Sequence, residues 1–172
     1  MTINDSMFCL LSNCEKSISY KRLVYNMYIY QIAGFDFNFK YVISNKGIKS
    51  KSLFAYADEL LCMGYIETAD NGNFCITSVG NEALYSFVAS QDELDFAQYI
   101  ENLLNSLTLE DLHFIVLTDI VITETNEKYG VEGLNSMRDK IEDTIRSLST
   151  EFSEENFNNS IYLLNKIKKG RL

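Results

Sequence analysis

The stretch from Lys40 to Gly80 constrains this chain most, because its pattern predicts a helix followed by a two-stranded wing. Ser50 is placed to cap the helix, since its hydroxyl can accept hydrogen bonds from the free backbone N–H groups of the first turn. Gly64 ends the helix, because glycine adopts the left-handed conformation without steric cost. Between them, apolar residues recur at the spacing of one buried helical face, at Leu53, Phe54, Ala57, Leu60 and Leu61.

Two short strand-like patterns follow this helix, over residues 65–69 and 74–77, and an Asn-Gly pair at 71–72 lies between them. Such a pair has the backbone twist that a tight hairpin needs. Helix, glycine, strand, turn and strand form the second half of a winged helix. We therefore predict a mainly α fold with a small β wing, in which a winged helix-turn-helix over residues 1–88 precedes a helical C-terminal half over residues 89–172.

The rest of the chain is predicted to be helical apart from one extended segment. Aromatic residues alternate with polar residues there, at Phe35, Phe37, Phe39 and Tyr41. The helix over 109–122 (LEDLHFIVLTDIVI) is apolar on nearly every face, so we expect it to be central and buried. The other helices are expected to begin after Asn4 or Asp5, to run from Tyr20 to Ala33, and to start near Thr77 or Ser78, Ser90, Thr108 and Ser153, with Gly130 and Gly133 bracketing a loop.

The composition is that of a globular chain, with 47% apolar and 23% charged residues among 172. No apolar run approaches the roughly 18 residues that a membrane span requires, and the N-terminus lacks the basic-then-apolar pattern of a signal peptide. We therefore expect a cytoplasmic protein that does not interact with a membrane.

The formal net charge of −9 is spread unevenly along the chain. Residues 1–60 hold seven Lys and Arg against five Asp and Glu, a balance of +2, which leaves −11 for residues 61–172. No Lys or Arg occurs from Ser52 to Glu127. An acidic surface binds a phosphate backbone poorly, because each contact depends on a basic side chain that releases counterions. The basic N-terminal third is therefore the part of the chain where nucleic acid could bind.

The sequence shows no catalytic or metal-binding pattern. Four cysteines, at positions 9, 14, 62 and 75, form no CxxC pair, so we expect reduced, mostly buried thiols and no zinc site. His113 is the only histidine, and no Ser or Cys nucleophile motif accompanies it. The acidic pairs Asp92/Glu93 and Glu110/Asp111 lie in first helical turns, where the helix dipole favours them. We therefore predict a protein that is not an enzyme and carries no cofactor.

A basic cluster surrounds the N-terminus of the helix that Ser50 caps, at Lys46, Lys49 and Lys51. Positive side chains oppose the helix dipole there at about 0.3–1 kcal/mol each, and a bound phosphate would offset that cost. Solvated surface lysines are the alternative explanation. If the protein binds DNA, the residues expected to contact it are Lys21, Arg22, Lys46, Lys49, Ser50, Lys51 and Ser52.

Two features argue against DNA binding. The outer face of the same helix also carries Asp58 and Glu59, which the phosphates lining a major groove would repel. The predicted wing has Glu67 and Asp70 flanking its tip and no basic residue to enter a minor groove.

Tyrosines concentrate in the N-terminal half and favour a protein interface there. An exposed tyrosine buries a large, rigid ring at low entropic cost when a partner binds. Packing in the core or at its rim is the alternative for most of them. The residues expected to contact a protein partner are Tyr25, Tyr28, Tyr56 and Glu59.

Several short motifs follow one another along the chain: KRLVY at 21–25, an aromatic segment that ends at Ser50, GYI at 64–66, ITSVG at 76–80 and LTLEDL at 107–112. This order resembles the small bacterial YwgA-like proteins and the related SocA-like (Panacea) antitoxin domain. Of that family's YGPYS motif, the chain keeps the Gly and the capping Ser, while Ile48 and Lys49 replace the Pro and Tyr. The resemblance implies a winged helix followed by a helical C-terminal half, and the role of an antitoxin or adaptor.

The sequence thus favours a non-catalytic bacterial interaction module, antitoxin-like or adaptor-like, that binds a protein partner such as a toxin or the product of a neighbouring gene. A winged-helix transcriptional regulator that binds DNA is the alternative.

We also predict a homodimer through the C-terminal helices. The helix over 134–148 carries one apolar stripe flanked by charges of mixed sign, as at a helix seam, at Leu134, Met137, Ile141, Ile145 and Leu148. The helix over 109–122 can bury this stripe within the chain, but it is apolar on more than one face. The last helix adds a second stripe through Phe157 and Ile161, so apolar area remains for a second copy.

Overall fold

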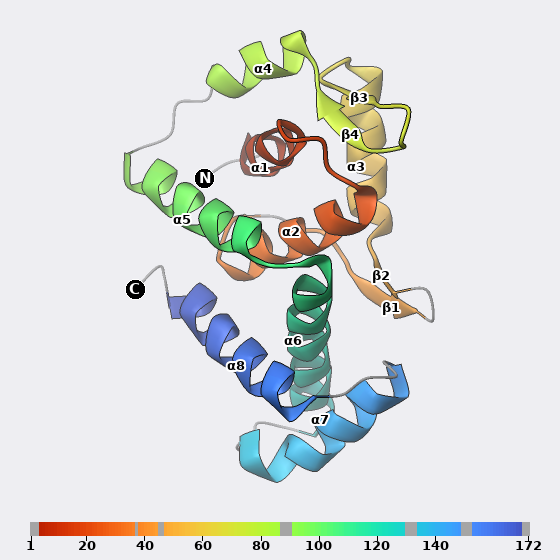
Figure 1. Ribbon diagram of the computed structural model, residues 1–172, viewed down its shortest axis with the longest axis vertical. Coiled ribbons are helices and arrows are strands. Elements are labelled where there is room, and N and C mark those ends of the chain that lie inside the picture. Colours follow the sequence, from red (N-terminus) through yellow and green to blue (C-terminus); the bar gives the residue numbers. More distant parts are fainter. Residues whose placement is uncertain are drawn as a thin grey trace.

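The computed structural model describes residues 4–36, 38–44, 47–86, 91–129, 134–148 and 153–169. Within them the chain is mostly helical, with two small antiparallel two-stranded sheets (Figure 1), which confirms the predicted mainly α fold with a small β part. The N-terminal elements are α1 (Asn4–Cys14), α2 (Tyr20–Ile32), β1 (Val42–Ser44), β2 (Gly47–Lys49), α3 (Lys51–Cys62), β3 (Ile66–Thr68), β4 (Phe74–Ile76) and α4 (Ser78–Tyr85). The C-terminal elements are α5 (Gln91–Ser106), α6 (Leu109–Tyr129), α7 (Leu134–Leu148) and α8 (Glu154–Lys169).

The hairpin after α3 forms as predicted. Strands β3 and β4 pair antiparallel, with Ile66 opposite Ile76, and Gly72 lies in the turn between them at φ +77°. Ile18, in the connection between α1 and α2, forms an isolated antiparallel bridge with Phe74 of β4 through two backbone hydrogen bonds of 2.9 and 2.8 Å. The chain before α2 therefore lies against the hairpin that follows α3.

The connection between α2 and α3 differs from the prediction. The predicted extended segment covers residues 35–44, and among its described residues only the last three form a strand, β1. The pairing of β1 with β2 in a hairpin was not predicted. The aromatic residues of the segment pack against different elements. Phe35 stacks on Phe96 of α5 with 5.6 Å between ring centroids, and Tyr41 packs edge-on against Tyr28 of α2 at 4.9 Å. The alternation therefore marks aromatic contacts with separate helices and not a row in a sheet.

Helix α2 is the centre of the core. Every residue from Leu23 to Tyr30 is buried, because α2 packs against α1, β2, α6 and α8. Figure 1 shows α2 crossing the middle of the molecule, with α1 above it and α6 below. This helix therefore belongs to the packing of both halves of the chain.

Helix α6 is the central helix of the C-terminal half, as predicted. It packs against α2, α7 and α8, and every residue from Phe114 to Val121 is buried. A capping box begins it, because the Thr108 backbone N–H donates to Asp111 Oδ2 at 2.9 Å and the Asp111 N–H donates to Thr108 Oγ1 at 3.1 Å. The α7 and α8 side chains buried around it are Ile141, Ile145, Phe157, Leu164 and Ile167.

Some predictions fall outside the described residues. The boundary placed after residue 88 is one of them. The others concern Phe37, Lys46, Phe87, Ser90, Gly130, Gly133 and the side chains of Leu134 and Met137. Across the described ranges, no helix combines the length and the apolar character that crossing a membrane would require.

Candidate protein-binding surface

Helix α3 is fixed at both ends, and this sets which of its faces points outward. Ser50 Oγ accepts a hydrogen bond from the Leu53 backbone N–H at 3.2 Å, and Tyr20 Oη donates to the Ser50 carbonyl at 2.9 Å. Gly64 follows the helix at φ +73°. The inner face is buried through Leu53, Ala57 and Leu60. Phe54 was predicted on this face but is 49% exposed, so that prediction is wrong. The other exposed residues of the helix are Lys51, Ser52, Ala55, Asp58, Glu59 and Cys62.

An open cavity of about 500 Å³ lies beside α3. One wall comes from α3 through Ser52, Ala55, Tyr56 and Glu59, and the rest comes from Ser6, Asp36, Asn38 and Phe39. The Phe39 and Tyr56 rings lie 5.8 Å apart between centroids, at 46° to each other. Asp36 and Glu59 are exposed, and none of the lining residues is basic. The α3 cavity thus combines an aromatic wall with two carboxylates.

Tyr56 is a neutral ring at physiological pH. Burial raises the pKa of Tyr56 above its ordinary value of 10.0, a hydrogen bond with the Ser6 side chain opposes the shift, and the nearby Glu59 carboxylate adds to it. The cavity therefore carries negative charge from its carboxylates and the negative face of an aromatic ring, a combination that attracts a cation.

The structure brings together two of the four residues predicted to contact a protein, Tyr56 and Glu59. It corrects the prediction for Tyr25 and Tyr28, which are 0% and 7% exposed. Tyr25 Oη lies 2.9 Å from His113 Nδ1, and Tyr28 Oη donates to Asp119 Oδ2 at 2.9 Å. Because α2 is enclosed by other elements, its tyrosines bind core partners and are not available on the surface.

Two of the residues predicted to contact DNA are committed to structural hydrogen bonds, which corrects that prediction for both. Ser50 is 1% exposed and its hydroxyl caps α3. The Arg22 guanidinium donates to the carbonyls of Leu104 and Leu107 at 2.7 and 3.1 Å, so it holds the end of α5. The Ser50 hydroxyl is therefore buried away from a phosphate, and the Nη2 group of Arg22 is already bound within the fold.

The other predicted DNA contacts lie at the surface where they are described. Lys21, Lys49 and Lys51 are exposed. Ser52 is exposed as well, and its Oγ accepts a hydrogen bond from the Lys40 backbone N–H at 3.1 Å. The exposed lysines flank the start of α3, whereas its outer face and the hairpin tip are acidic through Asp58, Glu59, Glu67 and Asp70.

The cysteines and the histidine of the described residues show no metal-binding cluster. No group of three or more His, Cys, Asp and Glu side chains among them could hold a metal ion. Burial raises the pKa of the Cys14 thiol to about 12, and the neighbouring Cys75 adds to the shift, so this thiol stays protonated and unreactive. Burial and the charge of Lys21 lower the pKa of His113 below 6.5, against the opposing effect of Glu110.

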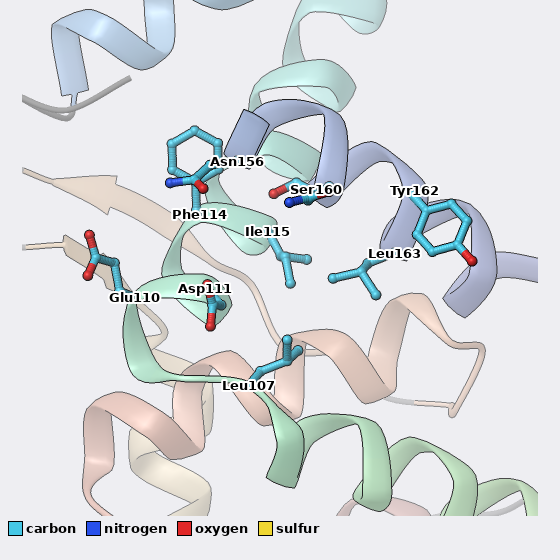
Figure 2. A pocket seen from close by; sticks show the side chains of 10 residues that line it. Leu107, Glu110, Asp111, Phe114, Ile115, Asn156, Ser160, Tyr162 and Leu163 are labelled. Atoms are coloured by element: carbon cyan, nitrogen blue, oxygen red, sulfur yellow. The ribbon is translucent and has the colours of Figure 1, made fainter. Parts of the chain in front are cut away.

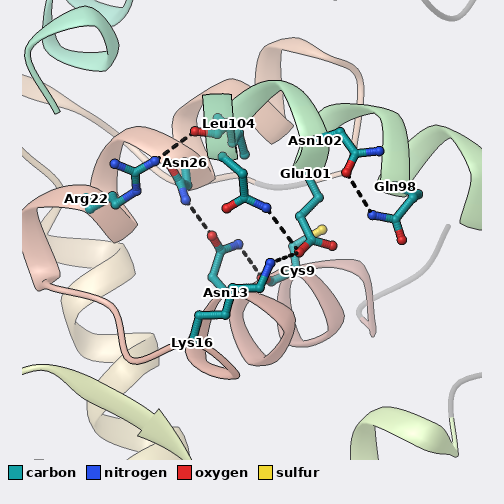
Figure 3. Close-up of polar contacts among 10 residues, drawn as sticks. Cys9, Asn13, Lys16, Arg22, Asn26, Gln98, Glu101, Asn102 and Leu104 are labelled. Atoms are coloured by element: carbon teal, nitrogen blue, oxygen red, sulfur yellow. Dashed lines mark hydrogen bonds and ion pairs between the residues drawn. The ribbon is translucent and has the colours of Figure 1, made fainter. Parts of the chain in front are cut away.

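Two further hollows lie away from α3. A groove of about 500 Å³ runs between the first two turns of α6 and the first three turns of α8 (Figure 2). A smaller cavity of about 110 Å³ lies among α1, α2 and α5, where polar side chains meet (Figure 3). There Asn26 Nδ2 donates to Asn13 Oδ1 at 2.5 Å, and Lys16 Nζ forms an ion pair with Glu101 Oε1 at 3.2 Å. The Asn26 bond joins α2 to α1, whereas the Lys16 ion pair and the contacts of Arg22 attach α5 to the N-terminal part of the chain.

Five residues of the α3 cavity were not predicted as contacts: Ser6, Asp36, Asn38, Phe39 and Ala55. A signal for three of them was present, since Asp36 and Asn38 are the polar members of the aromatic–polar alternation and Phe39 is an aromatic one. Ser6 comes from α1, and no local pattern indicates that it would approach α3.

The chain matches no family model, and no curated protein and no solved structure shows a significant similarity to it.

Proposed function

We propose that this protein is a non-catalytic winged-helix module, antitoxin-like or adaptor-like, and that the α3 cavity holds a basic side chain of a protein partner. The observation that carries the proposal is the cavity itself, whose lining has two aromatic rings, two exposed carboxylates and no basic residue. Two of its residues, Tyr56 and Glu59, are ones that the sequence alone already indicated.

The order of the N-terminal elements supports the winged-helix part of the proposal. Helix, short extended segment, two helices and a two-stranded hairpin follow one another, and the extended residue Ile18 pairs with the hairpin at Phe74. The β1–β2 hairpin between α2 and α3 replaces the tight turn of a simple helix-turn-helix. The sequence resemblance to the YwgA-like and SocA-like family is part of the same proposal, and it is the source of the antitoxin or adaptor role.

Arginine is the side chain that the cavity fits best. A cation within about 6 Å of an aromatic ring gains about 0.5–1 kcal/mol at an exposed site. A guanidinium can stack on the Phe39 or Tyr56 ring and still donate two parallel hydrogen bonds to a carboxylate such as Glu59, which an ammonium cannot do. The partner is therefore a protein that presents an arginine on a loop or a helix.

Binding of a set of short peptides in solution tests this proposal. Short peptides with one central arginine, each paired with its citrulline counterpart, are titrated against the protein by fluorescence anisotropy. We expect binding only of arginine peptides, and a loss of at least tenfold, about 1.4 kcal/mol, in Glu59→Lys and Tyr56→Ala. Glu82→Lys makes the same charge change on the exposed face of α4 and should leave binding unchanged.

The product of a neighbouring gene is the second probe, used as a purified protein in the same assay. Its binding should show the same dependence on Glu59 and Tyr56. A partner that binds both variants as tightly as it binds the wild-type protein would refute a role for the α3 cavity.

DNA binding is the second candidate function, and the exposed Lys21, Lys49 and Lys51 around the start of α3 favour it. A gel-shift assay at low salt with DNA from the upstream region of the gene tests it. Binding that is lost in Lys49→Glu and Lys51→Glu, and that weakens steeply with salt, would support this function over the first. Binding that ignores both substitutions would remove it.

We further propose a cytoplasmic location. Cys14, Cys62 and Cys75 form no disulfide. A reducing compartment keeps thiols in this state, and this supports the proposal.

A further inference from the structure

The groove between α6 and α8 has chemically different ends. Leu107, Ile115 and Leu163 point into its middle, as Figure 2 shows, and Ile115 is 1% exposed. Glu110 lies at one side of the groove in this view, and Tyr162 lies at the other. Apolar side chains therefore lie between an acidic end and an aromatic end, and they share the lining with the polar side chains of Asp111, Asn156, Asn159 and Ser160.

The aromatic end also carries a positive charge. Tyr162 is 59% exposed, and Lys166 Nζ lies 4.9 Å from the centroid of its ring. On the neighbouring helix α5, Tyr99 is 43% exposed. A large aromatic side chain thus stands in solvent next to a cation, while the opposite end of the same groove carries an exposed carboxylate at Glu110.

We propose that this groove is the interface of a two-fold symmetric homodimer. A two-fold axis through the groove places the aromatic end of each copy against the acidic end of the other, since in such an interface each contact occurs twice. Tyr162 of each copy enters the groove of the second copy, over Leu107 and Ile115, and Lys166 pairs with Glu110 of that copy. The groove volume of about 500 Å³ accommodates an aromatic ring.

The charge pattern favours a second copy over an unrelated protein. The groove lining supplies the carboxylate, and Lys166 supplies the cation from beside the groove, over the Tyr162 ring, so the surface is complementary to itself. The α7 stripe that first suggested a dimer cannot form this interface, because Ile141 and Ile145 are 1% and 0% exposed within one chain. In Figure 1, α8 and α3 lie on opposite sides of the molecule, so dimerisation leaves the α3 cavity free. The inference does not depend on the proposed function.

Sedimentation velocity between 1 and 100 µM tests this interface. We expect a mass of twice 19.8 kDa at the upper concentrations. Tyr162→Glu and Lys166→Glu should each raise the dimer dissociation constant at least tenfold, because the first places a carboxylate among the apolar side chains of the groove and the second sets like charges against each other. Tyr85→Glu, on an α4 residue that is 81% exposed, is the matched control and should leave the dimer intact.

A charge exchange makes the test specific to the pairing of the two ends. Glu110→Lys alone should weaken the dimer, and the double variant Lys166→Glu with Glu110→Lys should restore it to near the wild-type dissociation constant. A mass of 19.8 kDa at every concentration would overturn the proposal. A dimer that is insensitive to Lys166→Glu would also overturn it, because this position is exposed and its change leaves folding intact. The same holds if the double variant dimerises as weakly as either single variant.

Discussion

Replacing Gly80 by alanine sets two effects of opposite sign against each other in α4. Gly80 is buried in the first turn of this helix, and its backbone N–H donates to Thr77 Oγ1 at 3.0 Å. Helix propensity alone would favour alanine by about 1 kcal/mol. A Cβ atom at this position, however, would lie 2.0 Å from the Tyr65 carbonyl oxygen and 2.8 Å from Ile76 Cγ1.

The clash outweighs the gain in propensity. Cβ contacts below 3.0 Å are essentially never seen, so α4 or the start of the hairpin must move by at least 1.0 Å, the difference between 3.0 and 2.0 Å. Overpacking of this kind costs typically about 1–3 kcal/mol, and the upper end applies here because the obstacle is a backbone carbonyl. After the gain of about 1 kcal/mol, we expect Gly80→Ala to lower the free energy of unfolding by about 2 kcal/mol.

Urea denaturation and thermal unfolding measure this effect. A loss of about 2 kcal/mol should lower the melting temperature by about 4–8 °C in a chain of this length, with an unchanged denaturant slope. Val79→Ala changes an exposed residue in the same turn and should stay within about 0.5 kcal/mol of the wild type. A Gly80→Ala protein at least as stable as the wild type would refute the reasoning, because the gain in helix propensity would then exceed the steric cost.

Three further substitutions test the polar contacts that join the elements. Lys168→Met should destabilise the fold by about 1–3 kcal/mol in urea denaturation, because it leaves the Asp119 carboxylate, which is 4% exposed, without its cation. Asp119→Asn should cost less, because Lys168 is 48% exposed and its ammonium can return to water. Equal losses, or a larger loss in Asp119→Asn, would contradict this reasoning. The pKa of His113 is lowered in the folded state, so the unfolded chain binds a proton on this imidazole more readily; the stability that the neutral imidazole contributes is complete above about pH 6.5 and is lost as the pH falls below that value. His113→Gln should therefore flatten the pH dependence of the melting temperature between pH 7.5 and 5.5. An unchanged pH profile would rule out this role of His113. Thr77→Ala removes the capping hydroxyl that lies 3.0 Å from the Gly80 backbone nitrogen, and it should lower the free energy of unfolding by about 1 kcal/mol in the same denaturation assay. Thr77→Ser keeps the hydroxyl and should keep the cap. Equal losses in both variants would show that the hydroxyl is not the cause.

The elements that sequence analysis predicted well are those that depend on near neighbours. The cap at Ser50, the helix end at Gly64 and the turn at Gly72 each depend on a few adjacent residues, and the structure has all three. The β1–β2 hairpin was missed although its strands are no shorter than β3 and β4, which are also three residues long. Its turn sequence lacks the Asn-Gly pair that marked the second hairpin.

The candidate site was predicted in part for a related reason. Tyr56 and Glu59 could be placed because the helical period of α3 separates its inner and outer faces. Tyr25 and Tyr28 could not, since the same period says nothing when every face of a helix is covered. Whether a tyrosine is exposed then depends on distant segments, and here these are the α6 residues His113 and Asp119.

The enclosure of α2 also explains how the two predicted units of the chain are joined. Tyr25 meets His113 of α6, Tyr28 meets Asp119, and Arg22 donates to the end of α5, so three side chains of one helix hold the C-terminal half. Leaving a buried polar group without its partner costs about 1–3 kcal/mol, and a shift of α6 by one turn would leave several unpaired at once. Apolar packing alone would tolerate such a shift better, because hydrophobic contacts are not directional. The polar contacts of α2 therefore favour a single arrangement of α6 against it.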